Sequence, residues 1–103
     1  MDAEYIDYLD EIRIDFIDND DEVVIANIYG NGDCLIESTY AGDIICIIFK
    51  HIKNTVKNML HLPPNQHIEV GNISLRDTQV NDNNIVFVIN LLGNDFNFSV
   101  KMN

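Results

Sequence analysis

The chain has 103 residues, enough for one compact domain, and its 47% apolar content is typical of folded proteins rather than disordered ones. Its formal net charge of −11 disfavours direct contact with nucleic acids or anionic membranes, since both need clustered lysine and arginine side chains. We therefore expect a single domain over residues 1–103 that has basic proteins as partners, with no direct binding of nucleic acid or membrane.

The negative charge is concentrated at the start of the chain. Residues 1–22 contain ten carboxylates and one arginine, a net charge of −9, whereas the other 81 residues contribute −2. Because Arg13 is the one basic residue in this acidic N-terminal segment, 1–22, we expect the segment to lack salt bridges. The body of the domain is nearly neutral.

Sequence patterns predict the cellular location of the protein and the redox state of its cysteines. The chain starts with Met-Asp-Ala-Glu, without the basic and apolar regions of a secretory signal, and no apolar run approaches the roughly 20 residues of a membrane span. Cys34 and Cys46 lie in apolar surroundings. We expect a cytoplasmic protein in which both cysteines are buried free thiols.

The first half of the chain is predicted to form strands. Residues 3–10 are compatible with either a short helix or an extended segment. Ile12, Ile14 and Phe16 then alternate with charged residues, as in a half-buried strand. Turn residues at 19–21 and 30–33 separate this strand from two more. The three predicted strands cover residues 11–16, 23–29 and 34–39.

The middle of the chain is predicted to be one long helix, residues 42–61. Apolar residues recur there at spacings of three and four, and lysines lie on the opposite side. Asp43 at the start favours the helix dipole, and Pro63-Pro64 ends the helix.

Strands follow the helix. Alternating apolar residues on either side of Gly71 predict short strands at 68–70 and 73–75. Residues 85–92 are almost wholly apolar and predict a central strand covered on both faces, followed by a hairpin at Gly93-Asn94 and a strand over 96–102. The expected fold class is α+β: a mainly antiparallel sheet in the order β3-α-β3, with one long helix packed on one face.

Catalytic patterns are not found, so we predict no catalytic residues and no cofactor. No Cys-x-x-Cys pair is present, and Cys46 is five residues from His51 in the predicted helix, which places the two on different faces. A calcium loop starting at Asp18 would need glycine and glutamate where Val23 and Tyr29 stand. We expect no metal site, but a weak cation site near residues 18–22 stays open as an alternative.

The acidic segment is the candidate binding site. Concentrated charge destabilises a protein by self-repulsion, and the tyrosines among the acids are of a type enriched at binding hot spots. On strand 11–16, Glu11 and Asp15 flank Arg13 on one side. The predicted partner-binding residues are Tyr5, Asp7, Tyr8, Asp10, Glu11, Asp15, Asp18, Asp20, Asp21 and Glu22.

In size, charge and lack of catalytic residues, the chain is similar to two groups of small acidic microbial inhibitors: immunity proteins that neutralise nuclease toxins, and phage anti-defence proteins such as anti-CRISPRs. No motif matches either group, so no residue role is carried over. We expect an inhibitor, as a monomer or homodimer, that binds a basic nucleic-acid-processing protein, with an immunity protein first and an anti-defence nucleic-acid mimic second. The alternatives are a non-catalytic module that self-associates through an edge strand such as 96–102, and a small enzyme or cation-binding domain.

Overall fold

The computed structural model describes residues 2–16, 25, 27–30 and 32–101. They form two packed antiparallel sheets and one α-helix, which confirms the α+β class and the mainly antiparallel pairing. The elements in chain order are β1 (Asp2–Ile6), the 3₁₀ helix η1 (Asp7–Leu9), β2 (Glu11–Asp15), β3 (Asn27–Gly30), β4 (Cys34–Ser38), β5 (Ile44–Phe49), α1 (Ile52–Met59), β6 (Ser74–Val80), β7 (Asn84–Leu91) and β8 (Asn94–Lys101).

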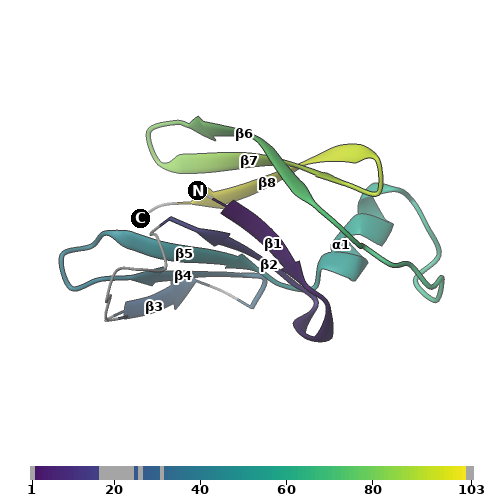
Figure 1. Cartoon of the computed structure of the whole chain (residues 1–103), viewed down its shortest axis with the longest axis horizontal. Coiled ribbons are helices and arrows are strands. Elements are labelled where there is room, and N and C mark those ends of the chain that lie inside the picture. The colour runs from purple at the N-terminus through teal and green to yellow at the C-terminus, as the bar shows by residue number, and fades with distance from the viewer. Residues whose placement is uncertain (1, 17–24, 26, 31, 102–103) are drawn as a thin grey trace.

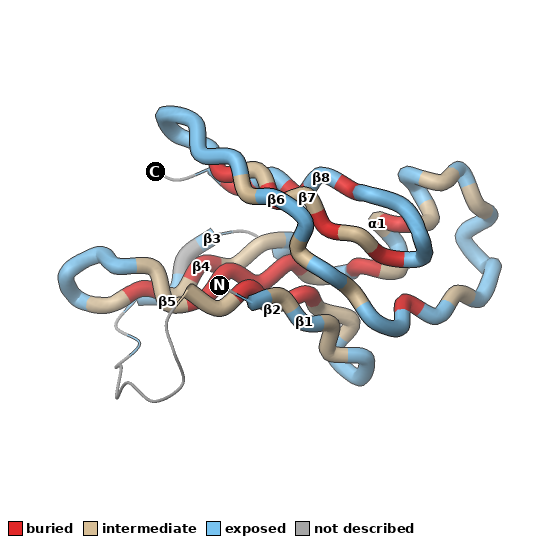
Figure 2. The backbone as a smooth tube through the Cα atoms, turned by 45° about the horizontal axis from the view of Figure 1, so that its top comes forward, coloured by how far each residue is buried: buried red, intermediate tan, exposed pale blue. Residues whose placement is uncertain are grey.

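The two sheets stack face to face (Figure 1). The larger has the strand order β1-β2-β5-β4-β3, and the smaller has the order β6-β7-β8. Figure 2 shows the buried residues lining the space between the two layers. Phe87 of β7 is fully buried there and meets Phe16 and Phe49 edge to face, with ring centroids 6.2 and 6.0 Å apart. Helix α1 lies at one end of the layers and adds Ile52 and Val56 to this core.

The long helix predicted over 42–61 is wrong in its first half, because residues 44–49 form β5. A run of isoleucines with one cysteine and one phenylalanine fits both a helical stripe and a strand buried on both faces. Isoleucine is branched at Cβ and favours the strand. β5 lies between β2 and β4, and Cys46, Ile47, Ile48 and Phe49 are all buried. The helix that remains has eight residues, so the β3-α-β3 order becomes five strands, a helix and three strands.

Other predicted strands have mixed outcomes. β2 and β4 lie where the sequence placed them, and β8 covers the predicted strand but starts two residues earlier, at Asn94. β7 is the central strand of its sheet, but its residues alternate between buried and half-buried, so only one face is in the core. Residues 68–70 do not join a sheet, and one strand, β6, starts at Ser74. Of the predicted strand 23–29, residues 23, 24 and 26 lie outside the described part, and β3 starts at Asn27.

The sharp turns use left-handed backbone. The β7–β8 hairpin turns at Leu92 and Gly93, with φ of 51° and 75°, one residue earlier than predicted. Two consecutive positive φ angles suit a two-residue hairpin because their twist matches that of the strands. No helix in the described part of the chain is long and apolar enough to cross a membrane.

Candidate functional site

The tip of the β1–β2 hairpin carries the most exposed residues of the predicted site. Residues 3–10, ambiguous in sequence, are extended in β1 and then form the turn η1. Asp10 closes the turn with a left-handed backbone (φ 53°), and its N–H donates to the Asp7 carbonyl at 3.2 Å. Tyr8 is 86% exposed and Leu9 is 47% exposed. Two large apolar side chains therefore project from the tip.

Asp10 attaches this tip to helix α1. Its carboxylate accepts a hydrogen bond from the Tyr5 hydroxyl at 2.7 Å and from the Lys53 backbone N–H at 3.1 Å, and its carbonyl accepts from the Ile52 N–H at 3.3 Å. The first N–H groups of a helix have no partner within the helix, so a carboxylate there stabilises it. Burial, together with the bond to Asp10, raises the pKa of Tyr5 well above its ordinary value. Asp10 and the Tyr5 hydroxyl are thus engaged inside the molecule.

Two predicted site carboxylates form ion pairs with lysines from later elements. Asp7 lies 3.9 Å from Lys53, and Glu11 lies 4.0 Å from Lys50. The expectation that residues 1–22 lack salt bridges is therefore wrong, because the basic partners come from distant positions in the chain. The side chain of Asp7 is 82% exposed, whereas that of Glu11 is only 13% exposed. Only the first of these carboxylates is freely accessible to a partner.

The outer face of the large sheet gathers further charges. Arg13 and Glu37, on β2 and β4, are 3.8 Å apart across the intervening β5. Arg13 Nε is buried and has no hydrogen-bond partner. Asp15 is half-buried and lies opposite Asp2 in the β1–β2 register. The like charges of this pair lie directly across from each other, an arrangement that costs stability.

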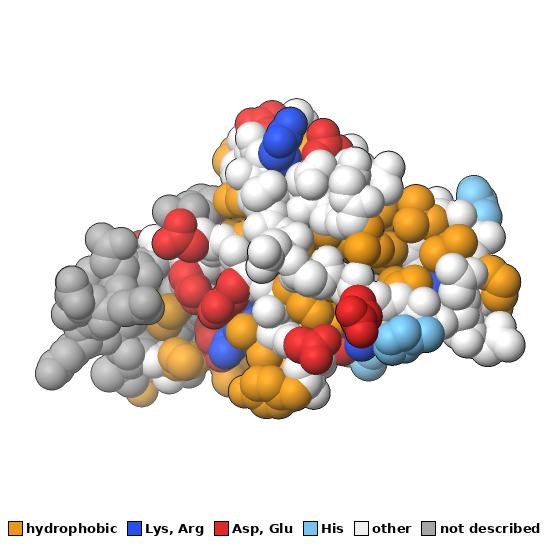
Figure 3. Space-filling view, turned by 45° about the vertical axis from the view of Figure 1, so that its right-hand side comes forward, with side chains coloured by type: hydrophobic (Ala, Val, Ile, Leu, Met, Phe, Trp, Pro, Cys, Tyr) orange, Lys and Arg blue, Asp and Glu red, His pale blue; other side chains and the backbone are white. Residues whose placement is uncertain are grey.

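Exposed carboxylates follow the edge strand β1. Asp2 and Glu4 are exposed on its outer side, and Asp7 continues the series into the turn. Figure 3 shows acidic side chains spaced across this face of the molecule, with basic side chains beside some of them. Same-side residues of a strand are about 6.6 Å apart, so Asp2 and Glu4 are neighbours along the edge, and Asp7 follows in the turn after β1. We call Asp2, Glu4 and Asp7 the acidic row.

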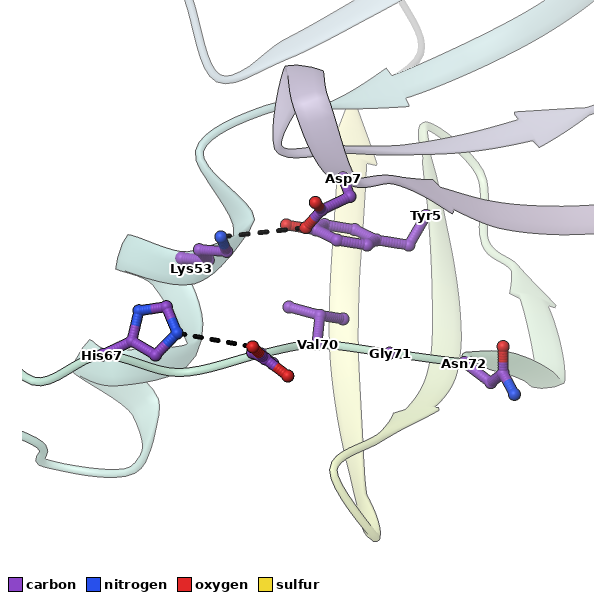
Figure 4. Close-up of a pocket in the computed structure, with 8 residues that line it drawn as sticks. Tyr5, Asp7, Lys53, His67, Val70, Gly71 and Asn72 are labelled. Carbon is purple, nitrogen blue, oxygen red and sulfur yellow. Dashed lines mark ion pairs between the residues drawn. The ribbon is translucent and has the colours of Figure 1, made fainter.

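A cleft of about 510 Å³ adjoins the acidic row. Its lining residues are Tyr5, Asp7, Lys53, His67, Glu69, Val70, Gly71 and Asn72. Figure 4 shows Tyr5, Asp7 and Lys53 on one wall and the chain from His67 to Asn72 on the other. His67 Nε2 lies 3.6 Å from a carboxylate oxygen of Glu69. The cleft therefore combines an aromatic ring, two carboxylates and two basic groups.

Sequence reasoning missed several of these residues and named others outside the described part. Glu37, Lys53 and Glu69 carried no local signal, because only the tertiary fold brings them beside β1 and β2. Asp18, Asp20, Asp21 and Glu22 fall outside the described residues, as does the alternative cation site there. The predicted site residues that the structure describes thus lie in three places: at the hairpin tip, on the outer face of the large sheet, and at the hydrogen-bonded contact with the start of helix α1.

Nucleophilic chemistry at the cysteines is disfavoured by their surroundings. Neither Cys34 nor Cys46 is part of a disulfide bond. Burial raises the pKa of Cys34 to about 11; burial, followed by the charge of Asp15, raises the pKa of Cys46 to about 12. The reactive thiolate is therefore scarce at neutral pH. Among residues 2–16, 25, 27–30 and 32–101, no three His, Cys, Asp or Glu side chains are arranged to hold a metal ion.

Comparison of the chain with protein-family models, curated proteins and solved structures finds no match.

Proposed function

We propose that this protein is a non-catalytic inhibitor that binds and blocks a basic nucleic-acid-processing protein, such as a nuclease, in the cytoplasm. The observation that carries the proposal is the acidic row beside the exposed tip of the β1–β2 hairpin. A row of carboxylates presents negative charge at intervals, as a nucleic-acid backbone does. A channel lined with lysine and arginine would attract it.

The hairpin tip supplies the apolar contact that charge alone lacks. Electrostatic complementarity mainly speeds encounter and selects partners, whereas buried aromatic side chains hold complexes together. Tyr8 and Leu9 project beside Asp7, and Asp10 holds the turn against α1. A turn already held in one conformation loses less entropy on binding. The tip is suited to enter a pocket of the partner while the acidic row lies along basic residues at its rim.

Within this proposal, we favour an immunity protein that neutralises a nuclease toxin over a phage anti-defence protein that imitates nucleic acid. Both use the same surface, but they differ in what is blocked. An immunity protein that binds beside the active site leaves DNA binding by the nuclease intact, whereas a mimic competes with DNA. Adding excess non-cleavable DNA separates them, because it displaces only the mimic.

The proposal is tested with two variants that have the same net charge. Asp2→Asn/Glu4→Gln neutralises part of the acidic row, and Asp43→Asn/Asp82→Asn neutralises two exposed carboxylates elsewhere. The immobilised protein is used to isolate partners from its source cells, and the nuclease activity of each purified partner is measured with and without the protein. We expect one basic nuclease, inhibited at a one-to-one ratio by the wild type and the control variant but more weakly by the row variant.

Salt provides a second measurement of the same complex. Because exposed charges are screened over roughly 10 Å at 0.1 M salt, we expect the association rate to fall steeply as salt rises. An association rate independent of salt, or partners that are acidic and retain full activity, would contradict the proposal.

A second function is favoured by β8, which is the edge strand of the small sheet and exposes Asn97, Ser99 and Lys101. A long regular edge strand can pair with another strand, so this protein would be a structural or regulatory module that associates with a copy of itself. Sedimentation of the Asp2→Asn/Glu4→Gln variant distinguishes this function. A stable oligomer that survives the change, with no basic partner found, favours self-association.

A further inference from the structure

Strand β8 is the most regular of the four strands that form the edges of the two sheets. β1 carries the exposed carboxylates Asp2 and Glu4, which would meet like charges on a copy of β1, and β3 has only four described residues. β6 has a register shift between Leu75 and Asp77. β8 has eight residues, no proline and no shift against β7. Because short, bulged or like-charged edges resist pairing with another chain, β8 is the edge best suited to it.

The register with β7 determines which backbone groups of β8 are free. Leu91 and Asn94 close a two-residue hairpin, so they form a hydrogen-bonded pair, and every second pair after them is bonded in the same way. The residues between those pairs direct both N–H and C=O away from β7. They are all exposed, and among the described residues no other strand pairs with β8. The four residues with these outward backbone groups are Asp95, Asn97, Ser99 and Lys101.

The same four residues are complementary to a second copy of themselves. When β8 lies antiparallel to a copy with Phe98 opposite Phe98, Asp95 lies opposite Lys101, and Asn97 lies opposite Ser99. The two-fold symmetry repeats both pairs, so all four outward residues have a partner. Opposite charges directly across from each other stabilise a strand pair. A shift of the copy by two residues in either direction would break both charge pairs.

The carboxylate of Asp95 has an oxygen available for this contact. Its Oδ1 accepts a hydrogen bond from the Asn90 amide at 2.9 Å and lies 3.9 Å from Arg76 Nε. Neither contact involves Oδ2, and the side chain is 49% exposed. A carboxylate accepts several hydrogen bonds through its two oxygens. Asp95 can therefore receive Lys101 of a second copy while it keeps both neighbours.

We propose that this protein forms a homodimer in which β8 pairs antiparallel with β8 of a second copy, with Phe98 opposite Phe98 and Asp95 opposite Lys101. The two three-stranded sheets then join into one continuous sheet. This inference rests on the second proposed function, self-association through an edge strand, and adds the orientation and register of the copy. The acidic row belongs to the other sheet and lies outside this contact.

The register is tested by reversing its charges. Lys101→Asp places carboxylates opposite each other in a dimer of that variant, and Asp95→Lys places ammonium groups opposite each other. We expect each variant alone to dimerise about tenfold more weakly than the wild type in sedimentation equilibrium. The mixed dimer of the two variants should be about as strong as the wild-type dimer, because every acid of one variant then lies opposite a lysine of the other.

The control for this experiment is Glu69→Lys, which changes the net charge as Asp95→Lys does but at an exposed carboxylate outside the two sheets. The Lys101→Asp variant carries a fluorescent label, and its sedimentation is measured with each unlabelled variant in turn. Glu69→Lys should bind it more weakly than Asp95→Lys does. Circular dichroism first establishes that each variant has the wild-type fold.

Amide hydrogen exchange of the wild type gives a second measurement, which needs no variant. As the protein concentration rises, exchange should slow at residues 95, 97, 99 and 101, since these N–H groups donate to the second copy. The outward amides of β6, the other edge of the same sheet, should not change.

A chain that stays monomeric at every concentration would overturn this inference together with self-association, and would leave the proposed inhibitor unaffected. A dimer that Lys101→Asp does not weaken, or that slows exchange at another edge, would overturn the register while self-association by a different surface remains. Equal binding of Glu69→Lys and Asp95→Lys to the labelled variant would also overturn it, because net charge and not the facing pairs would then control dimerisation.

Discussion

The hydroxyl of Tyr5 donates a 2.7 Å hydrogen bond to Oδ1 of Asp10, and the same oxygen accepts the backbone N–H of Lys53, 43 residues further along the chain. This shared acceptor connects the β1–β2 hairpin to the start of α1. It also explains why Asp10, in the middle of the acidic segment, serves the fold instead of facing a partner.

The coupling between Tyr5 and Asp10 is measurable. Asp10→Ala removes the acceptor of both bonds, and we expect a loss of about 1–2 kcal/mol or more in the free energy of unfolding, the range of a lost helix cap. Tyr5→Phe should cost about 1 kcal/mol. Urea unfolding followed by circular dichroism gives both values. The double variant should lose less than the sum of the single variants; strict additivity would mean that the bond contributes nothing to stability.

Tyr8 is predicted to be a binding hot spot. Tyr8→Ala should weaken the complex with a basic partner about tenfold or more, because it removes an aromatic anchor, while the free energy of unfolding changes by less than about 0.5 kcal/mol. Tyr40 is a matched control, since it is also 86% exposed but lies outside the hairpin. Titration calorimetry compares the two variants. A similar effect of Tyr40→Ala, or no effect of either change, would argue against the hairpin tip as the contact.

Stability is expected to fall at alkaline pH. Folding raises the pKa of Cys34 to about 11 and that of Cys46 to about 12 from ordinary values near 9. The unfolded chain therefore loses these protons first. The stabilising contribution is complete below pH 9 and decreases as the pH rises toward 11 and 12, by about 1.4 kcal/mol per pH unit for each thiol.

Urea midpoints at pH 8 and pH 10.5 measure this decrease. Cys46→Ala should make the decline of stability with pH shallower by about 1.4 kcal/mol per pH unit, the contribution of one thiol, even though the variant is less stable at every pH. A variant with the same pH slope as the wild type would show that the thiol does not cause the decline.

Gly30 is predicted to be intolerant of substitution. Its φ is 132°, and a Cβ there would overlap the backbone carbonyl of Cys34 at the start of β4. Gly93 also has a positive φ, 75°, but a Cβ at that position meets nothing within 4 Å. Gly93→Ala should therefore cost about 1 kcal/mol of strain, whereas Gly30→Ala should cost clearly more because the backbone must also shift. Thermal unfolding compares them, and equal losses would contradict the predicted overlap.

Local sequence patterns were sufficient for much of the fold. Side chains alternate across a strand, so the period of two at Ile12 and Ile14, and again at Phe96 and Phe98, predicted which residues face the core. Residues 44–49 could not be assigned in this way, because an unbroken apolar run fits both a buried strand and a helical stripe. Its position between β2 and β4 decided the outcome.

In the acidic segment, too, the sequence determined some properties and the tertiary structure decided others. Its sequence alone established that negative charge gathers at residues 1–22, because net charge is a property of composition. Which carboxylates remain accessible was decided by the tertiary structure: Lys50, Lys53 and the first turn of α1 reach back to Glu11, Asp7 and Asp10. Their positions are 39 to 46 residues away in the chain, and only the folding of the sheets brings opposite charges from such distances within 4 Å.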